Sequence, residues 1–373
     1  FERTHAINRD VFNGTISMSY DLTDWLKATI RSGFDTYSDR QDITISKGSL
    51  QGGGSARVIQ NGAEIWGESQ KGSYNLGLGR GYSLNNDLMI SGNKRLGQFT
   101  LDGFVGGTIY FRQDDGMESR TQGGLSIPAF YSLKASINPV AVASSIYKQQ
   151  VNSLFGRMSI SWNNLIYAEG TLRNDWSSTL PESTRSYLYP SVSGSLIISE
   201  LLPKMDWLSI WKLRGSWTSS KTPAGIYTIN SVYTITNNAW GTLSSATYPS
   251  TIRGVDVLPE SASTFEVGTA LNFFKNRVSV DISYYSKKMF DFLRSTGISS
   301  ASGYSANYIN IDEEITRRGL EISSNVTPVK KKDWQWDVSL NWSKYARYYT
   351  KLDSLFSADK PWVKVGKRVD HYI

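Results

Sequence analysis

Strict alternation of apolar and polar side chains runs along much of this 373-residue chain. In residues 12–20 every even-numbered residue is apolar or glycine, and every odd-numbered one is polar. The same pattern recurs in residues 334–342 and, with one exception at Phe155, in residues 153–162. Because successive side chains of a β-strand point to opposite faces, this period indicates strands with one apolar and one polar face. Helical spacing would scatter the two sets.

The alternation predicts an all-β chain of about twelve antiparallel strands. The third strand is interrupted most, because Gly77, Gly79 and Gly81 occupy every second position in it. The predicted strands are 9–20, 25–36, 73–91, 97–111, 149–162, 165–175, 188–199, 208–218, 262–274, 277–288, 315–327 and 334–345.

The predicted connections alternate between short and long. Short turns are expected at 21–24, 92–96, 163–164, 200–207, 275–276 and 328–333. Long loops are expected at 37–72, 112–148, 176–187, 219–261 and 289–314. A β-sandwich has no reason to keep every second connection short, whereas a transmembrane β-barrel has short periplasmic turns and long extracellular loops. The rhythm therefore favours a transmembrane antiparallel barrel.

Composition is compatible with a barrel and excludes several other classes. No apolar run approaches the roughly 18 residues that a membrane-spanning helix requires, but barrel strands need only about ten. The chain has no cysteine, which rules out disulfides, thiolate zinc sites and a cysteine nucleophile, and which suits passage through an oxidising periplasm. The net charge of +7 does not indicate nucleic-acid binding, since Lys330, Lys331 and Lys332 form the one tight basic run and suit a solvated turn.

Aromatic and basic residues predict how such a barrel would sit in its surroundings. Four tryptophans lie at or beside short turns, where an aromatic girdle would meet the membrane interface: Trp25, Trp162, Trp207 and Trp334. The alternative is that these indoles cap a sandwich core. Six cations on the polar sides of strands are expected to face a wet lumen: Lys27, Arg31, Arg157, Arg173, Lys212 and Arg214.

The long loop 219–261 is the expected recognition surface. It carries Tyr227, Tyr233, Trp240 and Tyr248 among serine, threonine, asparagine and glycine residues. Flat aromatic rings amid hydroxyls and amides stack on sugar rings or pack against a partner protein, and the alternative is that they pack on one another within the loop.

No catalytic or metal site is predicted, and no cofactor. His5 and His371 lie at opposite ends of the sequence, and the acidic runs at 114–115 and 312–314 lack the spacing of a calcium loop. The glycines around Gly79 lack the lysine and the helix of a phosphate loop, so a bulge or kink in the strand is the better interpretation. The strand carboxylates Asp102, Glu169, Glu266 and Asp281 are spread over different strands, and no nucleophile has a histidine placed to serve it.

Several segments resemble, in order and spacing, the barrel blocks of the SusC/RagA family of TonB-dependent outer-membrane transporters typical of Bacteroidetes. The blocks are SLFGRM at 153–158 with YAEGTLRNDWSS at 167–178, YPSVSG at 189–194, LPESASTFEVG at 258–268 with FKNRV at 274–278, and RGLEIS at 318–323 with WDVSLNW at 336–342. The resemblance covers roughly residues 9–345.

The resemblance implies a larger, 22-stranded barrel, of which residues 1–373 would form part of one barrel domain. The family's signal peptide, plug domain and last strands are not recognised in this sequence. Open sheet edges are costly in lipid, so either further strands complete the barrel or twelve strands close on themselves as a narrower pore.

The resemblance also implies a function: import of a bulky nutrient, an oligosaccharide or a peptide, across the outer membrane of a Gram-negative bacterium. Its expected partners are a SusD-like surface lipoprotein, TonB acting through the N-terminal region, outer-membrane lipids and the solute. The alternatives are a transporter-like scaffold barrel in a surface or secretion complex and a passive porin.

Overall fold

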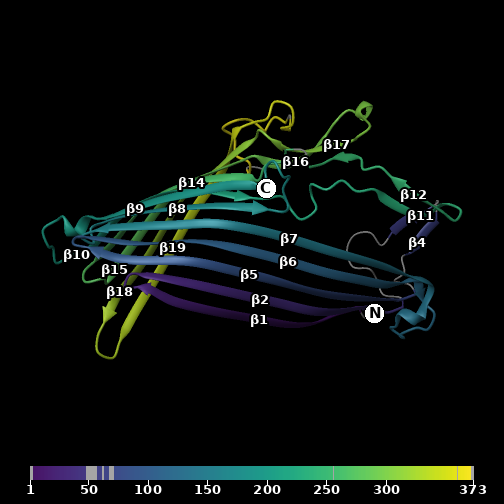
Figure 1. Cartoon of the computed structure of the whole chain (residues 1–373), viewed down its shortest axis with the longest axis horizontal. Coiled ribbons are helices and arrows are strands. Elements are labelled where there is room, and N and C mark those ends of the chain that lie inside the picture. Colours follow the sequence, from purple (N-terminus) through teal and green to yellow (C-terminus); the bar gives the residue numbers. More distant parts are fainter. Residues whose placement is uncertain are drawn as a thin grey trace. The chain divides into compact units, whose positions relative to one another are not determined.

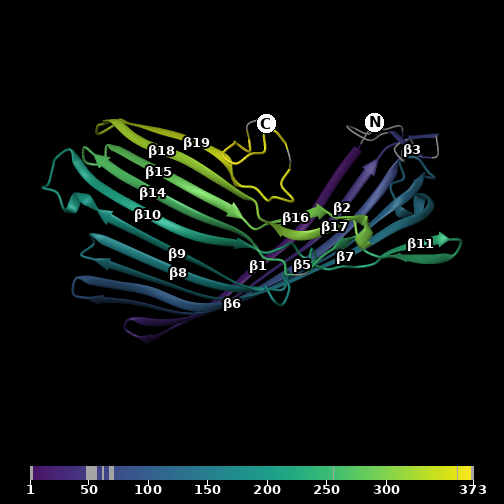
Figure 2. The ribbon, with the colours of Figure 1, turned by 90° about the horizontal axis from the view of Figure 1, so that it is seen from above.

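The computed structural model describes residues 3–47, 57–60, 63–66, 71–254, 256–358 and 360–370, and its main feature is one antiparallel sheet of twelve strands. Neighbouring strands follow the order β1-β2-β5-β6-β7-β8-β9-β10-β14-β15-β18-β19 (Figures 1 and 2). Their bounds are β1 Arg3–Thr23, β2 Leu26–Ile45, β5 Ser73–Leu96, β6 Phe99–Leu125, β7 Ser136–Trp162, β8 Ile166–Ser177, β9 Ser186–Ile197, β10 Leu208–Thr222, β14 Glu260–Phe273, β15 Val278–Phe290, β18 Glu314–Lys330 and β19 Gln335–Lys351.

Each of the twelve predicted strands corresponds to one strand of this sheet, so the predicted antiparallel all-β fold is confirmed. The first five strands are far longer than expected, with 27 residues each in β6 and β7. The predicted loop 112–148 was therefore wrong, because β6 and β7 occupy all of it except residues 126–135. Part of the predicted loop 37–72 lies outside the described residues, and β2 extends to Ile45 within it.

Short and long connections alternate along most of the sheet, as predicted. β1 and β2 are joined by two residues, 24–25, and β5 and β6 by 97–98. By contrast, residues 223–259 join β10 to β14, and residues 291–313 join β15 to β18. The pattern fails around β9. There the connection expected to be long spans only residues 178–185, and the one expected to be short spans residues 198–207 and includes the 3-10 turn η3, Ile198–Glu200.

The long connections contain small sheets of their own. β3 (Arg57–Gln60) pairs with β4 (Ala63–Trp66), and β11 (Thr234–Trp240) pairs with β12 (Leu243–Thr247). A three-stranded sheet joins β13 (Thr251–Ile252), β17 (Ala306–Ile311) and β16 (Phe292–Gly297). Two further 3-10 turns are η2 (Leu133–Ala135) and η4 (Ser300–Ser302). The predicted loops 219–261 and 289–314 therefore contain short strands of their own.

The chain divides into two compact units, and each has a small core. The first comprises residues 1–17, 31–86 and 109–150, and its core joins Tyr74, Leu125 and Ala135. The second comprises residues 18–30, 87–108 and 151–373, and its core joins Leu180, Tyr187, Ala224, Val257 and Leu293. The second core packs the connections 178–185, 223–259 and 291–313 against the ends of their strands.

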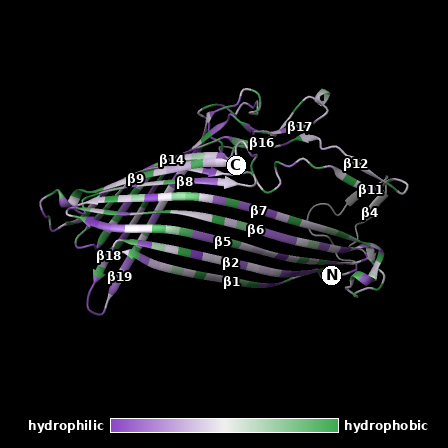
Figure 3. Cartoon of the chain, in the orientation of Figure 1, coloured by the Kyte–Doolittle hydropathy of each residue, from purple (hydrophilic) through white to green (hydrophobic). Residues whose placement is uncertain are grey.

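Most large apolar side chains lie outside these cores. Along the strands, hydrophobic and hydrophilic residues alternate (Figure 3). Leu154, Met158 and Val192 expose more than half of their surface, at 56%, 55% and 54%. Exposed aliphatic residues in regular rows need an apolar environment outside the protein. In the part of the chain that the structure describes, no helix is long and apolar enough to cross a membrane.

Candidate functional site: the polar face of the sheet

Strand register separates the sheet of the second unit into two chemically distinct faces. One register row runs Met158–Gly170–Val192–Trp217–Phe265 across β7, β8, β9, β10 and β14. The adjacent row on the other side runs Ser159–Glu169–Ser193–Ser216–Glu266 across the same strands. We call these the apolar face and the polar face. The candidate site is the polar face, because its side chains carry the charges and hydroxyls.

The first ionic cluster on the polar face joins three strands. Arg157 on β7 contacts Asp102 on β6, with Nη1 2.6 Å from Oδ1, and Glu169 on β8, with Nη2 2.7 Å from Oε2. The guanidinium therefore links a carboxylate on each of the two strands that flank β7. Ion pairs this exposed contribute on the order of 0.2–1 kcal/mol each. These ion pairs therefore hold the charged groups of Arg157, Asp102 and Glu169 in place on the polar face and add little to the stability of the sheet.

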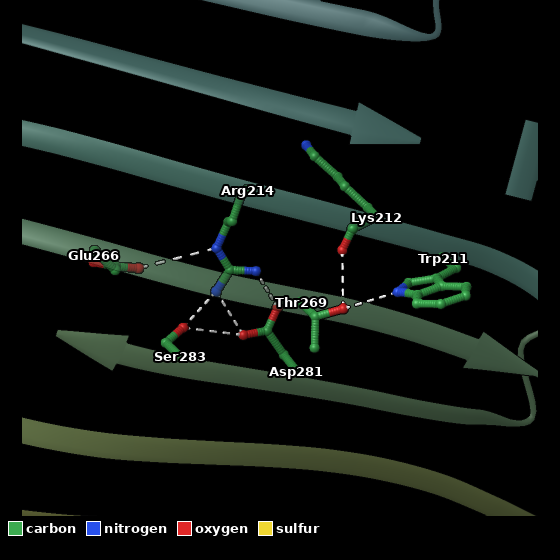
Figure 4. A network of polar contacts seen from close by, with 7 residues as sticks. All are labelled: Trp211, Lys212, Arg214, Glu266, Thr269, Asp281 and Ser283. Atoms are coloured by element: carbon green, nitrogen blue, oxygen red, sulfur yellow. Dashed lines mark hydrogen bonds and ion pairs between the residues drawn. The ribbon is translucent and has the colours of Figure 1, made fainter. Parts of the chain in front are cut away.

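The second cluster depends on a glycine. Arg214 on β10 reaches over Gly268 on β14 and donates to Asp281 on β15, with nitrogen–oxygen distances of 2.6 and 2.7 Å (Figure 4). The same guanidinium donates to Ser283 Oγ at 2.5 Å, and Glu266 lies 4.0 Å away. A Cβ on Gly268 would come within 2.8 Å of the guanidinium carbon. The missing side chain thus gives Arg214 its path across the strand.

A hollow of about 410 Å³ lies between these two clusters. Its walls include Arg157, Glu169, Arg214 and Glu266, with the serines of β9 and β10 between them. Lys212 also lines it, and its ammonium has no hydrogen-bond or ion-pair partner among the described residues (Figure 4). Among the described residues that line the hollow, Lys212 is therefore the cation without a partner, whereas Arg157 and Arg214 are paired with carboxylates.

The remaining predicted lumen cations do not line this hollow. Arg173 contacts Asp175 at 2.8 Å, donates to Ser153 Oγ at 2.9 Å and lies over the ring of Phe155. Lys27 approaches Asp21 at 3.4 Å, and Arg31 is exposed on β2 without an ion-pair partner in the described ranges. The structure thus brings Arg157, Lys212 and Arg214 together and leaves the other three apart. That all six face a lumen stays a prediction.

Of the four aromatic loop residues, two contact each other. Tyr233 and Tyr248 pack edge to face with centroids 5.5 Å apart, and Tyr248 shares a 2.8 Å hydrogen bond with Tyr304. Tyr227 has a φ of 59°, and Trp240 at the end of β11 is 86% exposed. Sequence reasoning missed Tyr304, which lies 56 residues from Tyr248 along the chain. No local pattern could have paired them.

The four predicted girdle tryptophans all lie at short turns or strand ends of the second unit. Trp25 lies in the β1–β2 turn under Lys94, and Trp162 ends β7 and donates to Gln98 Oε1 at 3.2 Å. Trp207 precedes β10 and stacks on Phe273 at 6.0 Å, and Trp334 in the β18–β19 turn is 75% exposed. Their role at a membrane interface stays a prediction.

The alternate glycines of β5 have a packing explanation. β5 runs through Gly77, Gly79 and Gly81 as one continuous strand. A Cβ on Gly79 would lie 3.0 Å from Asp39 Oδ1, and one on Gly81 would overlap the ring of Tyr37. Side chains of neighbouring strands thus lie across β5, so the glycines permit close approach and need no bulge or kink.

Acidic residues considered for calcium are occupied by cations instead. Asp114 pairs with Arg112 and Asp115 with Arg80, while Asp312 pairs with Lys351. Within the described residues, no three histidine, cysteine or acidic side chains are grouped as a metal site would require. His371 lies outside those residues.

Comparisons with known proteins give a consistent result. A family model described as "TonB dependent receptor-like, beta-barrel" matches residues 2–371. The TonB-dependent receptor SusC of Bacteroides thetaiotaomicron is 26% identical over 302 residues, which are 77% of this chain and 29% of that protein. The TonB-dependent receptor P3 of Formosa agariphila is 22% identical over 281 residues, which are 72% of this chain and 28% of that protein.

A solved structure shares the fold. The RagAB peptide importer in its open-open state superposes with a TM-score of 0.80 at 18% identity, covering 98% of this chain and 39% of that one. The chain therefore spans less than a third of the two receptors and about two fifths of the importer chain.

Proposed function

Because this chain belongs to the TonB-dependent receptor-like β-barrel family, we propose that it forms part of the wall of a transporter that imports a bulky nutrient across the outer membrane. In this proposal further strands complete a single barrel domain. The polar face lines the lumen, and the apolar face contacts outer-membrane lipids.

The observation that carries the proposal is the separation of the two faces. A solute-conducting wall needs water-compatible groups on one side and an uninterrupted apolar surface on the other. Arg157, Lys212 and Arg214 stand on the polar face, whereas Leu154, Met158 and Val192 are exposed on the other. A soluble sheet would bury those aliphatic side chains against a second layer.

The orientation follows from the connections. The short turns with Trp25 and Trp334 are assigned to the periplasmic side, and the long connections with their small sheets to the outside. Residues 222–252 contain no charged residue, although a fifth of the whole chain is charged. Tyr233, Tyr248 and Trp240 in this segment support contact with a solute through ring stacking and amide or hydroxyl hydrogen bonds.

The solute is proposed to be an oligosaccharide or a peptide. SusC and the RagAB peptide importer, to which the chain is similar, motivate these two classes. A SusD-like surface lipoprotein is the proposed partner outside, and TonB is proposed to act through the N-terminal part of the full-length protein.

The test is uptake by cells that carry the full-length protein. Fluorescent oligosaccharides and peptides of about 1–2 kDa are supplied with and without a protonophore, and a deletion strain sets the background. TonB-dependent import predicts uptake that falls to background when the proton gradient is dissipated. Uptake that survives the protonophore would instead indicate a passive pore, and uptake equal to the deletion strain would indicate a scaffold.

A further inference from the structure

Three cations stand side by side across strands β15, β18 and β19. Lys287, Arg317 and Arg347 are direct register partners, so their side chains leave the sheet on the same face. The row continues through Thr264, Thr218 and Ser191 to Thr171 and Arg157, which places it on the polar face. Hydroxyls thus extend the row away from the cations.

None of the three cations has an ion-pair partner among the described residues. Lys288, the neighbour of Lys287 on the opposite face, is by contrast paired with Glu314 at 2.8 Å. Arg347 acts electrostatically on Asp370, but that carboxylate pairs with Arg368 at 3.3 Å. Like charges directly opposite each other destabilise a sheet. The row therefore carries an uncompensated positive field in the absence of a ligand.

Two tyrosines hold the central guanidinium. Arg317 lies 3.8 Å from the ring centroid of Tyr345 and 5.7 Å from that of Tyr285. Tyr285 lies across Gly319, where a Cβ would be 2.5 Å from its Cζ atom. Tyrosine faces attract a guanidinium and leave its N–H edge for an acceptor. The Nε of Arg317 is buried and has no hydrogen-bond acceptor in the described part of the chain.

We propose that Lys287, Arg317 and Arg347 form a binding site for an oxyanion, a carboxylate or sulfate group carried by the imported solute. A guanidinium stacked on a ring can donate two parallel hydrogen bonds to such a group, and flanking cations add attraction. The neighbouring threonine hydroxyls supply further donors for a polar solute that moves along the row. The assignment to a transported solute rests on the proposed function.

Anion binding is measured on the purified full-length protein in detergent. Inorganic sulfate and sodium chloride are compared at equal ionic strength by the urea midpoint of tryptophan fluorescence. Sulfate stabilises folded proteins in general, so a specific site predicts a sulfate-induced midpoint increase that depends on the row. Arg317→Gln and Lys287→Gln should weaken apparent sulfate binding at least tenfold. Lys344→Gln, a cation of β19 on the apolar face opposite Leu320, is the matched control and should bind as the unaltered protein does.

Equal stabilisation by the two salts, or an unchanged sulfate response in both row variants, would overturn the site. Because a cation removed from the row relieves repulsion, both variants are expected to unfold at no lower urea concentration than the unaltered protein in low salt. A variant that binds sulfate weakly but unfolds at the same or a higher urea concentration has lost the binding site and not the fold.

The solute's part is tested with trigalacturonate and uncharged maltotriose as probes. Trigalacturonate should compete with sulfate, and maltotriose should not. If sulfate binds but trigalacturonate does not compete, the site does not serve a solute-borne carboxylate and that part of the proposal fails. Sulfate binding that persists in a protein whose uptake ignores the proton gradient would instead contradict the proposed function and leave the anion site standing.

Discussion

Single glycines decide which side chains meet on the polar face. Gly268 leaves the path by which Arg214 reaches Asp281, 67 residues away in sequence, and Gly319 leaves the space in which Tyr285 lies. Alternation in the sequence predicted that Arg214 lies on the polar side of its strand. It could not predict the ion pair between Arg214 and Asp281, because that pair depends on strand register and on the missing side chain at Gly268.

Gly268→Ala should displace the Arg214 side chain and reduce stability by about 1–3 kcal/mol, as overpacking does elsewhere. The added Cβ would stand 2.8–3.0 Å from three guanidinium atoms. Gly170→Ala is the control, since a Cβ there meets nothing within 4 Å. Urea unfolding of the full-length protein in detergent gives both values. Equal midpoints for the two variants would show that the crossing contributes nothing to stability.

Trp240→Ala should weaken capture of the solute without weakening the fold. Its side chain is 86% exposed, so stability should change by no more than about 0.5 kcal/mol. The expected kinetic effect is a higher half-saturation concentration for uptake with an unchanged maximal rate. Trp334→Ala, which removes an exposed indole at a short turn, should leave the half-saturation concentration unchanged. The same effect from both variants would remove the case for recognition by this loop.

At the scale of elements, the sequence predicted which segments form strands better than where they end. Alternation fades where both faces become polar, as at Arg112, Gln113, Asp114 and Asp115, which hydrogen-bond to one another two residues apart along β6. The strand continues there because the backbone ladder does not require apolar partners. The small sheets in the long connections were missed because strands of two to seven residues carry almost no periodic signal.

The segment after β19 depends on one carboxylate. Asp353 accepts backbone hydrogen bonds from Asp312 at 2.8 Å, Leu355 at 2.8 Å and Phe356 at 3.0 Å. These hydrogen bonds, that of Asp312 first, hold the pKa of Asp353 below its ordinary value. Because the pKa is lowered, the ionised carboxylate stabilises the folded segment at any pH above the ordinary pKa of about 3.9. This stabilisation is lost as the pH falls through the lowered pKa.

Acid should therefore loosen this segment, and Asp353→Ala should loosen it at every pH. Pepsin should cut the bond from Leu355 to Phe356 faster at pH 2 than at pH 4 in the unaltered protein. The Asp353→Ala variant should be cut readily at both pH values. Asp333→Ala in the β18–β19 turn controls for a general effect of charge removal. If the pH dependence of Asp353→Ala matches that of the unaltered protein, the carboxylate does not anchor the segment.

For the molecule as a whole, the proposed function requires that the two ends of the strands face different compartments. The 373 residues contain no cysteine, so a cysteine introduced among them is the single thiol of this segment. Trp240→Cys in the long connection should react with an impermeant maleimide on intact cells that carry the full-length protein, and Asn164→Cys in the β7–β8 turn should not. Reaction of Asn164→Cys alone would reverse the orientation.

We propose that one face of the sheet meets lipid and the other meets water. Nitroxide labels placed one at a time at residues 157–162 of the full-length protein in lipid bilayers test it directly. Labels at Met158, Ile160 and Trp162 should collide more often with oxygen, and labels at Arg157, Ser159 and Ser161 with a water-soluble nickel chelate. Accessibility that fails to alternate, or that alternates with the opposite phase, would contradict the claim.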